Sequence, residues 1–478
     1  MITAQEVAVL DRNAAALGID PRVLMEASGR AVANTVEAIA GADAEILIVA
    51  GRGNNGGDGF AAARYLEEHP LRVCLLGRPE SITTPEARTT YETLLDSEIP
   101  VETVTDTTDF DLGRPDVVVD AMLGTGVTGA LREPERTVAT RINDGTATVV
   151  AVDTPSGIDV DTGTAAGIAV NADRVVTFHD MKPGLADRDD VTVADIGIPT
   201  AAERFVGPGD RLRLSRDPTA HKGDFGRVLL VGGGPYTGAP ALTAQAALRG
   251  GADLATVYTP DPAADAVAGY SENLIVRRLE GPHLTPEHVP TLADAATDQD
   301  VLLVGPGLGD ADAPQTAVAD LLAGYEGTAV VDADALQVVP DVDTAATLIC
   351  TPHQGELAEM GGPQESAWTD RAPAVEDYAA TLDHVLLVKG AYDVISNGTT
   401  TRINRTGNPG MTVGGTGDVL AGVTAALAAT LDPVDAAALA AWANGRAGDD
   451  AVEASGYGLV ATDLLSRLPE ALWGEDDV

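Results

Sequence analysis

Short apolar runs recur along the first half of the chain, and each run ends in a loop rich in glycine, aspartate or serine. Residues 45–50, EILIVA, lead into GRGNNGGDG; residues 116–120, DVVVD, lead into AMLGTGVTGA; and residues 148–153, TVVAVD, lead into TPSGID. Helical patterns such as GFAAARYLEE lie between these strand-like runs. Strands that alternate with helices predict a parallel sheet whose ligands bind beyond the carboxyl ends of the strands. The three loops are therefore expected to converge on one crevice.

The same pattern restarts in the second half of the chain. A weakly patterned stretch with proline and glycine, residues 196–218, separates the two halves. We therefore predict two α/β domains, residues 1–212 and 213–478. The strand-like runs of the second half, with their loops, are RVLLVGGG (227–234), DVLLVGPGLG (300–309), TAVVDADAL (328–336), TLICTPHQGE (347–356) and HVLLVKGAYD (384–393).

The charge of the chain narrows the classes of partner. The net charge is -43, from 73 acidic and 30 basic residues, which argues against nucleic acids and acidic membranes because both are polyanions. The acids are spread along the whole chain, as on a halophile's surface that concentrated salt screens. The sequence shows neither a bilayer-spanning apolar run nor the pattern of a signal peptide. We expect a cytoplasmic protein.

The loop GRGNNGGDG (51–59) combines two kinds of binding group. Its glycines allow close approach of a phosphate, and the helix that follows offers free N–H groups. Asn54, Asn55 and Asp58 add oxygen atoms that suit a hard cation. Asp120, Ser156 and the carbonyl groups of GTGVTGA could complete the cation's shell. Taken singly, Asp120 and Asp153 could equally cap the elements that follow their strands.

Lysine is rare enough to mark positions of interest. Of the 30 basic residues only Lys182, Lys222 and Lys389 are lysines, so these positions are expected to need a compact ammonium group; survival by chance is the alternative. Asp153 and Lys182 are candidates for acid and base chemistry. Lys182 could equally anchor a phosphate.

The stretch NPGMTVGGTGDVLAG (408–422) predicts a second reactive centre. Its glycines precede an apolar helix that starts near Asp418, which makes an anion hole at a helix N-terminus. A carboxylate there can take a proton from a hydroxyl during phosphoryl transfer, although Asp418 could also be a helix cap. His353 follows a strand, where a histidine is more often packed or solvated than catalytic. Lys389 also ends a strand and could contact a phosphate.

Taken together, LMEASGRAVA, GRGNNGGDG, VVVDAMLGTGVTGA and VAVDTPSGIDVDTG resemble the NAD(P)H-hydrate epimerase domain over most of residues 1–212. The resemblance implies a Rossmann-like fold that interconverts the R and S forms of hydrated NADH and NADPH. It places the substrate on Asn54, Asn55, Gly56, Gly57, Asp58 and Asp153. It places potassium on Asn55, Asp120, Gly124, Thr125, Gly126, Val127, Thr128, Gly129, Ala130 and Ser156.

The second half resembles the NAD(P)H-hydrate dehydratase domain, which has a ribokinase-like fold, through HKGDFG, GGGPYTGAP, GPGLG, TPHQGE, VKGAYD and GGTGD. The resemblance implies that ADP phosphorylates the ring hydroxyl of the S hydrate and that elimination then releases NAD(P)H with AMP and phosphate. We expect magnesium to assist. Asp393 stands where threonine is common, which puts a hydroxyl contact to the nucleotide in doubt. The implied contacts to the hydrate are Ala239, Gly307, His353 and Asp418, and those to ADP are Lys389, Gly390, Ala391, Tyr392, Asp393 and Gly417.

Two other classes of protein fit parts of the pattern. A vitamin-precursor kinase would use the same ribokinase-like glycines and aspartate, but it would not require the fused first half, TPHQGE or HKGDFG. A non-catalytic dinucleotide sensor would leave Asp418 unexplained. The expected protein is a homo-oligomer that acts on NADHX and NADPHX, the hydrated coenzymes, with no nucleic-acid or membrane partner.

Overall fold

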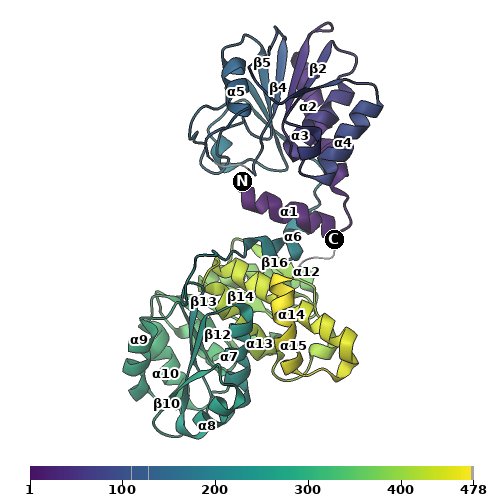
Figure 1. Cartoon of the computed structure of the whole chain (residues 1–478). Helices are drawn as coiled ribbons and strands as arrows, with labels where there is room; N and C mark the ends of the chain where they lie inside the picture. The colour runs from purple at the N-terminus through teal and green to yellow at the C-terminus, as the bar shows by residue number, and fades with distance from the viewer. Residues whose placement is uncertain (109, 127–128, 475–478) are drawn as a thin grey trace. The chain divides into compact units, whose positions relative to one another are not determined.

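The computed structural model describes residues 1–108, 110–126 and 129–474. Contacts within the chain divide it into two compact units, Met1–Ala202 and Glu203–Val478. Each unit is an α/β layer structure with helices on both faces of its sheet (Figure 1). The predicted fold class is therefore confirmed for both halves of the chain.

Within the described residues, the first unit contains a seven-stranded sheet with the strand order β3-β2-β1-β4-β5-β6-β7. Every neighbouring pair is parallel. The carboxyl ends of its strands therefore share one edge, as predicted. The strands are β1 (Ile46–Ala50), β2 (Leu71–Leu76), β3 (Val101–Val104), β4 (Val117–Ala121), β5 (Thr148–Val152), β6 (Arg174–Phe178) and β7 (Val191–Ala194).

Strand β1 shows why this sheet is buried on both faces. Ile46, Ile48 and Ala50 pack into one apolar cluster, and Leu47 and Val49 pack into another on the opposite face. Side chains alternate between the two faces of a strand, so an unbroken apolar run needs a helical layer on each side. The layers are built from α1 (Ala4–Ala16), α2 (Pro21–Ile39), α3 (Asn54–Tyr65), α4 (Pro85–Asp96) and α5 (Glu135–Asn143).

Helix α3 begins at Asn54, earlier than the sequence pattern indicated. The stretch GRGNNGGDG was expected to be a loop, but its last six residues form the first turns of α3. Glycine is needed in these first turns, because α3 packs so closely on the neighbouring loop and sheet that larger side chains would not fit. A Cβ atom at Gly56 would lie 2.1 Å from the carbonyl oxygen of Gly51, and one at Gly59 would lie 2.7 Å from the Cβ of Ala121. These glycines serve packing of the helix on the sheet.

Within the described residues, the second unit contains a nine-stranded sheet with the order β10-β9-β8-β11-β12-β13-β14-β15-β16. The pairs from β10 to β14 are parallel, and the last two pairs are antiparallel. The strands are β8 (Arg227–Val231), β9 (Leu254–Pro260), β10 (Ile275–Leu279), β11 (Val301–Val304), β12 (Thr328–Val331), β13 (Thr347–Cys350), β14 (Val385–Val388), β15 (Asp393–Ser396) and β16 (Thr401–Asn404).

Helices cover both faces of the second sheet as well (Figure 1). Residues of α7, α13, α14 and α15 form one apolar cluster with the sheet, and residues of α10 and α12 pack in the cluster on the other face. The helices are α7 (Gly238–Gly250), α8 (Asp261–Tyr270), α9 (Val289–Ala296), α10 (Asp312–Ala323), α11 (Gln354–Glu359), α12 (Trp368–Leu382), α13 (Thr416–Ala428), α14 (Pro433–Ser455) and α15 (Ala461–Trp473).

The division between the units falls inside the stretch 196–218 that the sequence marked as a seam. It falls after Ala202, inside the short helix α6 (Thr200–Arg204), whereas the sequence placed the limit between residues 212 and 213. The difference has a physical reason, because the intervening residues pack on the second unit. The Val206 N–H group donates to the Ile403 carbonyl oxygen at 2.9 Å, and the buried Asp210 accepts from Arg402 at 3.0 Å.

Candidate active sites

The first candidate site lies where β1, β4 and β5 end. Asp120 is fully buried at the end of β4, and its two oxygens accept from Ser156, from the backbone N–H at 2.8 Å and from the hydroxyl at 2.7 Å. Burial raises the pKa of Asp120 to about 6, and the hydrogen bonds from Ser156 oppose that rise. The strand ends thus bring Asp120 and Ser156 together, as the sequence predicted.

Asn55 lies against the loop that follows β4, and its side chain is unsatisfied. The residue is buried in the first turn of α3, yet neither its amide nitrogen nor its amide oxygen has a hydrogen-bond partner. A Cβ atom at Gly124 would lie 3.2 Å from the Asn55 side-chain oxygen, so the loop after β4 runs against the amide. Buried polar atoms are rarely left unpaired, and each such case calls for an explanation such as an ion.

The rest of the loop after β4 is only partly described. Thr125 is half-buried, whereas Gly126, Gly129 and Ala130 are exposed. Val127 and Thr128, which the sequence also assigned to potassium, lie outside the described residues.

Asp153 and Lys182 form a buried ion pair at the ends of β5 and β6. The Lys182 ammonium lies 3.6 Å from Oδ1 of Asp153 and donates to the carbonyl oxygens of Phe178, at 2.6 Å, and Asp180, at 3.1 Å. Asp153 has φ of 63°, in the left-handed region that favours glycine, and such strain clusters at functional sites. Both roles expected for Lys182, acid–base chemistry and the anchoring of a phosphate, stay predictions.

The remaining residues predicted on α3 have different surroundings. Asp58 is buried, and burial together with the charges of Asp153 and Asp11 raises its pKa well above the ordinary value. Asn54 is exposed, and its side-chain oxygen accepts from the Thr84 hydroxyl at 2.6 Å. Gly56 and Gly57 are buried by packing: a Cβ atom at Gly57 would lie 2.6 Å from the Met25 side chain.

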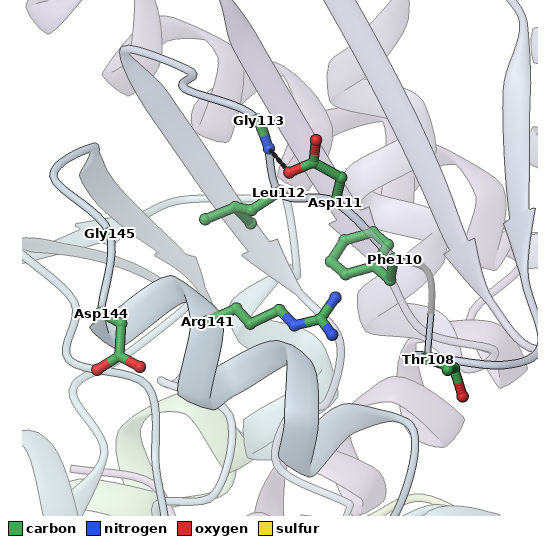
Figure 2. A pocket seen from close by; sticks show the side chains of 8 residues that line it. All are labelled: Thr108, Phe110, Asp111, Leu112, Gly113, Arg141, Asp144 and Gly145. Atoms are coloured by element: carbon green, nitrogen blue, oxygen red, sulfur yellow. Dashed lines mark hydrogen bonds between the residues drawn. The ribbon is translucent and has the colours of Figure 1, made fainter.

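A pocket of about 490 Å³ lies elsewhere on the first unit, and no predicted site residue lines it. Figure 2 shows Arg141 extending from the end of α5 toward the ring of Phe110, 5.7 Å from its centroid. Asp111 and Asp144 also line the pocket, in segments that precede β4 and β5. The pocket therefore belongs to the edge where strands begin, opposite the predicted crevice.

The second candidate site centres on Lys389 at the end of β14. Its ammonium lies 3.1 Å from Oδ1 of the buried Asp332 and 3.7 Å from Oε2 of Glu356. The Thr351 hydroxyl also donates to Oδ1 of Asp332, at 2.7 Å. The acids near Lys389 raise its pKa against the opposing effect of burial. Sequence reasoning missed Asp332 and Glu356, although VVDADAL and TPHQGE both follow strands.

Asp418 occupies the first turn of α13 and belongs to the same charge cluster. Burial and the charge of Asp332 raise the pKa of Asp418 to about 7, while Lys389 opposes the rise. The N-cap residue of α13 is Gly415 and not Asp418, which weakens the alternative that Asp418 is a cap. Gly414 has no heavy atom within 4 Å of where its Cβ atom would stand, so there is space for an anion at this helix start.

His353, Ala239 and Gly307 come from three different strand ends. The Nδ1 atom of His353 accepts from the N–H group of Glu356 at 3.0 Å, so the ring caps α11. Its Nε2 atom lies 3.6 Å from Oε1 of Glu356. Ala239 lies in the first turn of α7, and Gly307 has φ of 75°, with its would-be Cβ atom 2.9 Å from the Tyr236 carbonyl oxygen.

The segment Lys389–Asp393 closes the hairpin between β14 and β15. Asp393 uses both carboxylate oxygens within the fold: one accepts from the Gly390 N–H group at 2.8 Å and the other from Asn404 at 2.9 Å. Burial raises the pKa of Asp393 to about 6. The carboxylate therefore closes the turn. The predicted nucleotide residues Ala391 and Tyr392 are exposed on this hairpin, and a Cβ atom at Gly417 would lie 3.4 Å from the Lys389 ammonium.

Across the described residues, no group of three or more His, Cys, Asp or Glu side chains is arranged to hold a metal ion. This finding does not bear on a site built from amide, hydroxyl and carbonyl oxygens, such as the one around Asn55. Among those same residues, no helix combines the length and the apolar character of a membrane span.

Two family models match the chain, one in each unit. A model described as "YjeF-related protein N-terminus" matches residues 21–184, and a model described as "NAD(P)H-hydrate dehydratase" matches residues 228–470. The first match covers the strand ends with Asn55, Asp120 and Asp153. The second covers Lys389 and Asp418.

Relatives align with the chain over nearly its full length. A protein of Pyrobaculum aerophilum named bifunctional NAD(P)H-hydrate repair enzyme Nnr is 43% identical, and the alignment covers 98% of this chain and 98% of that protein. A protein of Archaeoglobus fulgidus with the same name is 41% identical, again with 98% of each chain covered.

Solved structures resemble the second unit. An ADP/ATP-dependent NAD(P)H-hydrate dehydratase from Bacillus subtilis, co-crystallised with ATP and Mg²⁺, is 27% identical with a TM-score of 0.50. The match covers 56% of this chain and 97% of that one. A ribokinase-like superfamily protein from Enterococcus faecalis also has a TM-score of 0.50, at 26% identity over 56% of this chain and 95% of that one. These similarities confirm the ribokinase-like fold predicted for the second half.

Proposed function

The chain belongs to the family of bifunctional NAD(P)H-hydrate repair enzymes, and from this premise we propose how its residues carry the two reactions. Its function is the repair of hydrated NADH and NADPH by epimerisation and dehydration. The observation that carries this conclusion is the match of both halves in one chain, since a vitamin-precursor kinase would not need the first. The kinase and the sensor are therefore not favoured. We assign epimerisation to residues 1–212 and dehydration to residues 213–478.

The pair Asp153 and Lys182 is proposed to carry epimerisation. Water adds to an enamine at the carbon bonded to nitrogen, so the hydrate bears its hydroxyl beside the ring nitrogen. Asp153 takes the hydroxyl proton, the oxygen lone pair forms a carbonyl, and the carbon–nitrogen bond breaks. Its electron pair goes to nitrogen, which takes a proton from Lys182. Ring closure on the other face of the carbonyl reverses these transfers and inverts the carbon. The 3.6 Å separation of the pair supports this assignment.

Potassium is proposed to bind beside this pair. The unpartnered amide of Asn55, the carboxylate of Asp120 and the hydroxyl of Ser156 offer oxygen ligands that fit a hard cation. The ion would neutralise charge next to the phosphate groups of the dinucleotide. The substrate itself is proposed to lie along Asn54, Gly56, Gly57, Asp58 and Asp153, with Gly124–Ala130 as further potassium ligands.

Asp418 is proposed to act as the base of the dehydration. It takes the proton of the ring hydroxyl while that oxygen attacks the β-phosphorus of ADP, and the bond from the β-phosphorus to the bridging oxygen breaks to release AMP. The neighbouring ring carbon then gives its proton to the departing phosphate, and the double bond forms as the carbon–oxygen bond breaks. A pKa near 7 suits a base that works at neutral pH.

The other predicted residues of this half are proposed to position the reactants. His353, Ala239 and Gly307 contact the hydrate, and the Lys389–Asp393 hairpin with Gly417 contacts ADP. Magnesium is proposed to bind together with the phosphate groups of ADP, because Mg²⁺ is usually held by substrate phosphates with one or two carboxylates. Such an ion neutralises charge on the transferring phosphoryl group.

Three expectations from the sequence stay predictions: a cytoplasmic location, a halophilic surface and a homo-oligomer. Light scattering in molar potassium chloride tests the oligomeric state.

Product analysis tests the division of labour between the halves. Purified S hydrate incubated with ADP and Mg²⁺ is expected to give NAD(P)H, AMP and phosphate in equal amounts. The Asp418→Asn variant is expected to give none of them while it still converts R hydrate to S. Equal dehydration by wild type and Asp418→Asn would contradict the assignment of the base.

A further inference from the structure

The first turn of α12 contacts the hairpin between β14 and β15 through two side chains. The Trp368 ring stacks on the Tyr392 ring, with 5.5 Å between the ring centroids and 21° between the ring planes. The Arg371 guanidinium donates to the Tyr392 carbonyl oxygen at 2.7 Å. Residues three apart lie on the same face of a helix. One face of α12 therefore contacts both the side chain and the backbone of Tyr392.

Arg371 is an unusual residue for its surroundings, because only 3% of its surface is exposed. The hydrogen bonds that its guanidinium donates go to carbonyl oxygens, of Tyr392 at 2.7 Å and of Ser366 at 3.5 Å, and its Nε atom has no partner. Burying a charge costs free energy, and carbonyl oxygens compensate it less fully than a carboxylate does. An apolar side chain would fill this position at lower cost, so the arginine indicates a need for its donor at Tyr392.

The backbone of the hairpin fits closely around the guanidinium. A Cβ atom at Gly390 would lie 3.1 Å from Nη2 of Arg371 and 3.2 Å from the Tyr392 carbonyl oxygen. The Asp393 carboxylate accepts from the Gly390 N–H group and from Asn404 on β16. The conformation of the hairpin is thus fixed by contacts with both α12 and β16.

Trp368 is itself held by a second aromatic ring. The Phe205 ring meets the Trp368 ring edge-on, with 5.8 Å between their centroids and 64° between their planes. The Arg405 guanidinium lies over the Phe205 ring, 4.6 Å from its centroid. Tyr392 remains 37% exposed. The three rings therefore form an array that supports the exposed tyrosine from the interior of the second unit.

We propose that Trp368 and Arg371 are positioning residues of the dehydratase half, which hold the hairpin Lys389–Asp393 in the conformation that binds ADP. This inference rests on the proposed contact of that hairpin with ADP. A hairpin that moves freely loses this freedom when a ligand binds, and the loss weakens binding. Contacts with α12 remove the cost before ADP arrives. Both residues therefore act on the affinity for ADP and leave the phosphoryl transfer step unchanged.

The test is calorimetric titration of the full chain with ADP and Mg²⁺, without hydrate. We expect the Kd for ADP to rise about tenfold in Trp368→Leu and in Arg371→Met, because the hairpin must then be ordered at the expense of binding. In steady-state dehydration of S hydrate, KM for ADP should rise by the same factor, while kcat at saturating ADP stays within about twofold of wild type. Fewer binding sites per chain and a lower kcat at an unchanged Kd would show a structural role alone and overturn the inference.

Three variants serve as controls. Trp368→Phe keeps a ring against Tyr392 and is expected to bind ADP as tightly as wild type. Arg371→Lys keeps a charged donor and is expected to weaken binding less than Arg371→Met does. Trp473→Leu removes a tryptophan from the end of α15, where its ring contacts Arg216, and its Kd should match wild type. Equal Kd values for Trp473→Leu and Trp368→Leu overturn the inference.

A double variant tests whether Trp368 acts through the Tyr392 ring. Trp368→Leu/Tyr392→Leu is expected to bind ADP no more weakly than Tyr392→Leu alone, because the second substitution removes a contact that the first has already lost. Additive losses overturn the inference. Should Trp368→Leu fail to fold, Arg371→Met decides: a raised Kd supports the inference, and a wild-type Kd overturns it.

The Lys389→Met variant separates this inference from the proposed function. If Lys389→Met binds ADP as tightly as wild type, the proposed contact between the hairpin and ADP is wrong. If Lys389→Met loses ADP binding while Trp368→Leu and Arg371→Met retain the wild-type Kd, only the role of α12 fails.

Discussion

The ammonium of Lys389 lies 3.1 Å from Oδ1 of Asp332, a buried carboxylate to which the Thr351 hydroxyl also donates. The pair joins the end of β14 to the end of β12, and both of its charges influence the pKa of Asp418. A buried charge is tolerated only when it is paired. Lys389 therefore contributes to stability as well as to the proposed binding of ADP.

Replacement of Lys389 by Met is expected to destabilise the second unit by about 3 kcal/mol, because Asp332 is left buried without its partner. Urea unfolding followed by tryptophan fluorescence measures this effect, since Trp368, Trp442 and Trp473 all lie in the second unit. The double variant Asp332→Asn/Lys389→Met is the control and should recover most of the loss. If Lys389→Met is as stable as wild type, the pair of Lys389 and Asp332 contributes nothing to the stability of the second unit.

The dehydration rate is expected to rise with pH through about 7, because burial and Asp332 raise the pKa of Asp418 to about 7 and the base must be ionised. Single-turnover rates on S hydrate with ADP give the profile. Asp418→Glu should retain a pH-dependent rate, and Asp418→Asn should be inactive at every pH. A wild-type rate that is flat between about pH 5 and 9 would contradict the role.

The free energy of unfolding should depend on pH in the direction opposite to the dehydration rate, because of the same Asp418 carboxyl. Its pKa is about 7 in the folded chain and about 4 in the unfolded chain, so the folded state binds the proton more tightly. The free energy of unfolding is therefore expected to fall as pH rises from about 4 to 7. In Asp418→Asn the fall of the free energy of unfolding with pH should be shallower, because this variant has no titrating group at position 418. If urea unfolding gives the same pH dependence for wild type and Asp418→Asn, the raised pKa does not belong to Asp418.

Asn55→Leu is expected to lower the potassium affinity of the epimerase about tenfold or more. The variant should lose little stability, because the amide of Asn55 makes no hydrogen bond that the substitution could break. The epimerisation rate as a function of potassium concentration, at constant ionic strength with choline chloride, measures the effect. Dehydration of S hydrate by the same variant is the internal control and should not change. An epimerase rate independent of potassium in wild type would remove the ion from the account.

The net charge of -43 predicts that the chain needs salt for stability. Repulsion among surface carboxylates weakens as the Debye length falls to about 3 Å at 1 M salt. The thermal midpoint of unfolding is therefore expected to rise with salt concentration. Sodium, potassium and choline chlorides compared at equal strength separate screening from the specific potassium site. A midpoint that stays constant from low to molar salt would argue against a halophilic surface.

Much of both candidate sites could be predicted because parallel strands share one edge. Asp120 and Asp153 each end an apolar run, so the sequence alone indicated that the loops after them meet. Lys389 was found in the same way, helped by the rarity of lysine. Even the α/β fold of each half follows from runs of apolar residues that must be covered on both faces.

Other features depend on packing that a pattern of residues does not encode. Asp332 belongs to the second candidate site only because the Lys389 ammonium packs 3.1 Å from its Oδ1 atom. The early start of α3 depends on how closely Gly56 approaches Gly51, and the use of both Asp393 oxygens depends on Asn404, which lies on the neighbouring strand β16.

The most direct test of the whole account is the recovery of reduced-nicotinamide absorbance from a mixture of R and S hydrates. The assay contains ADP, Mg²⁺ and molar potassium chloride. We predict recovery of the entire mixture, with Asp153→Asn stopping after the S fraction is consumed. Recovery of only the S fraction by wild type, or no recovery with either ADP or ATP, would contradict the claim that this one chain repairs both epimers.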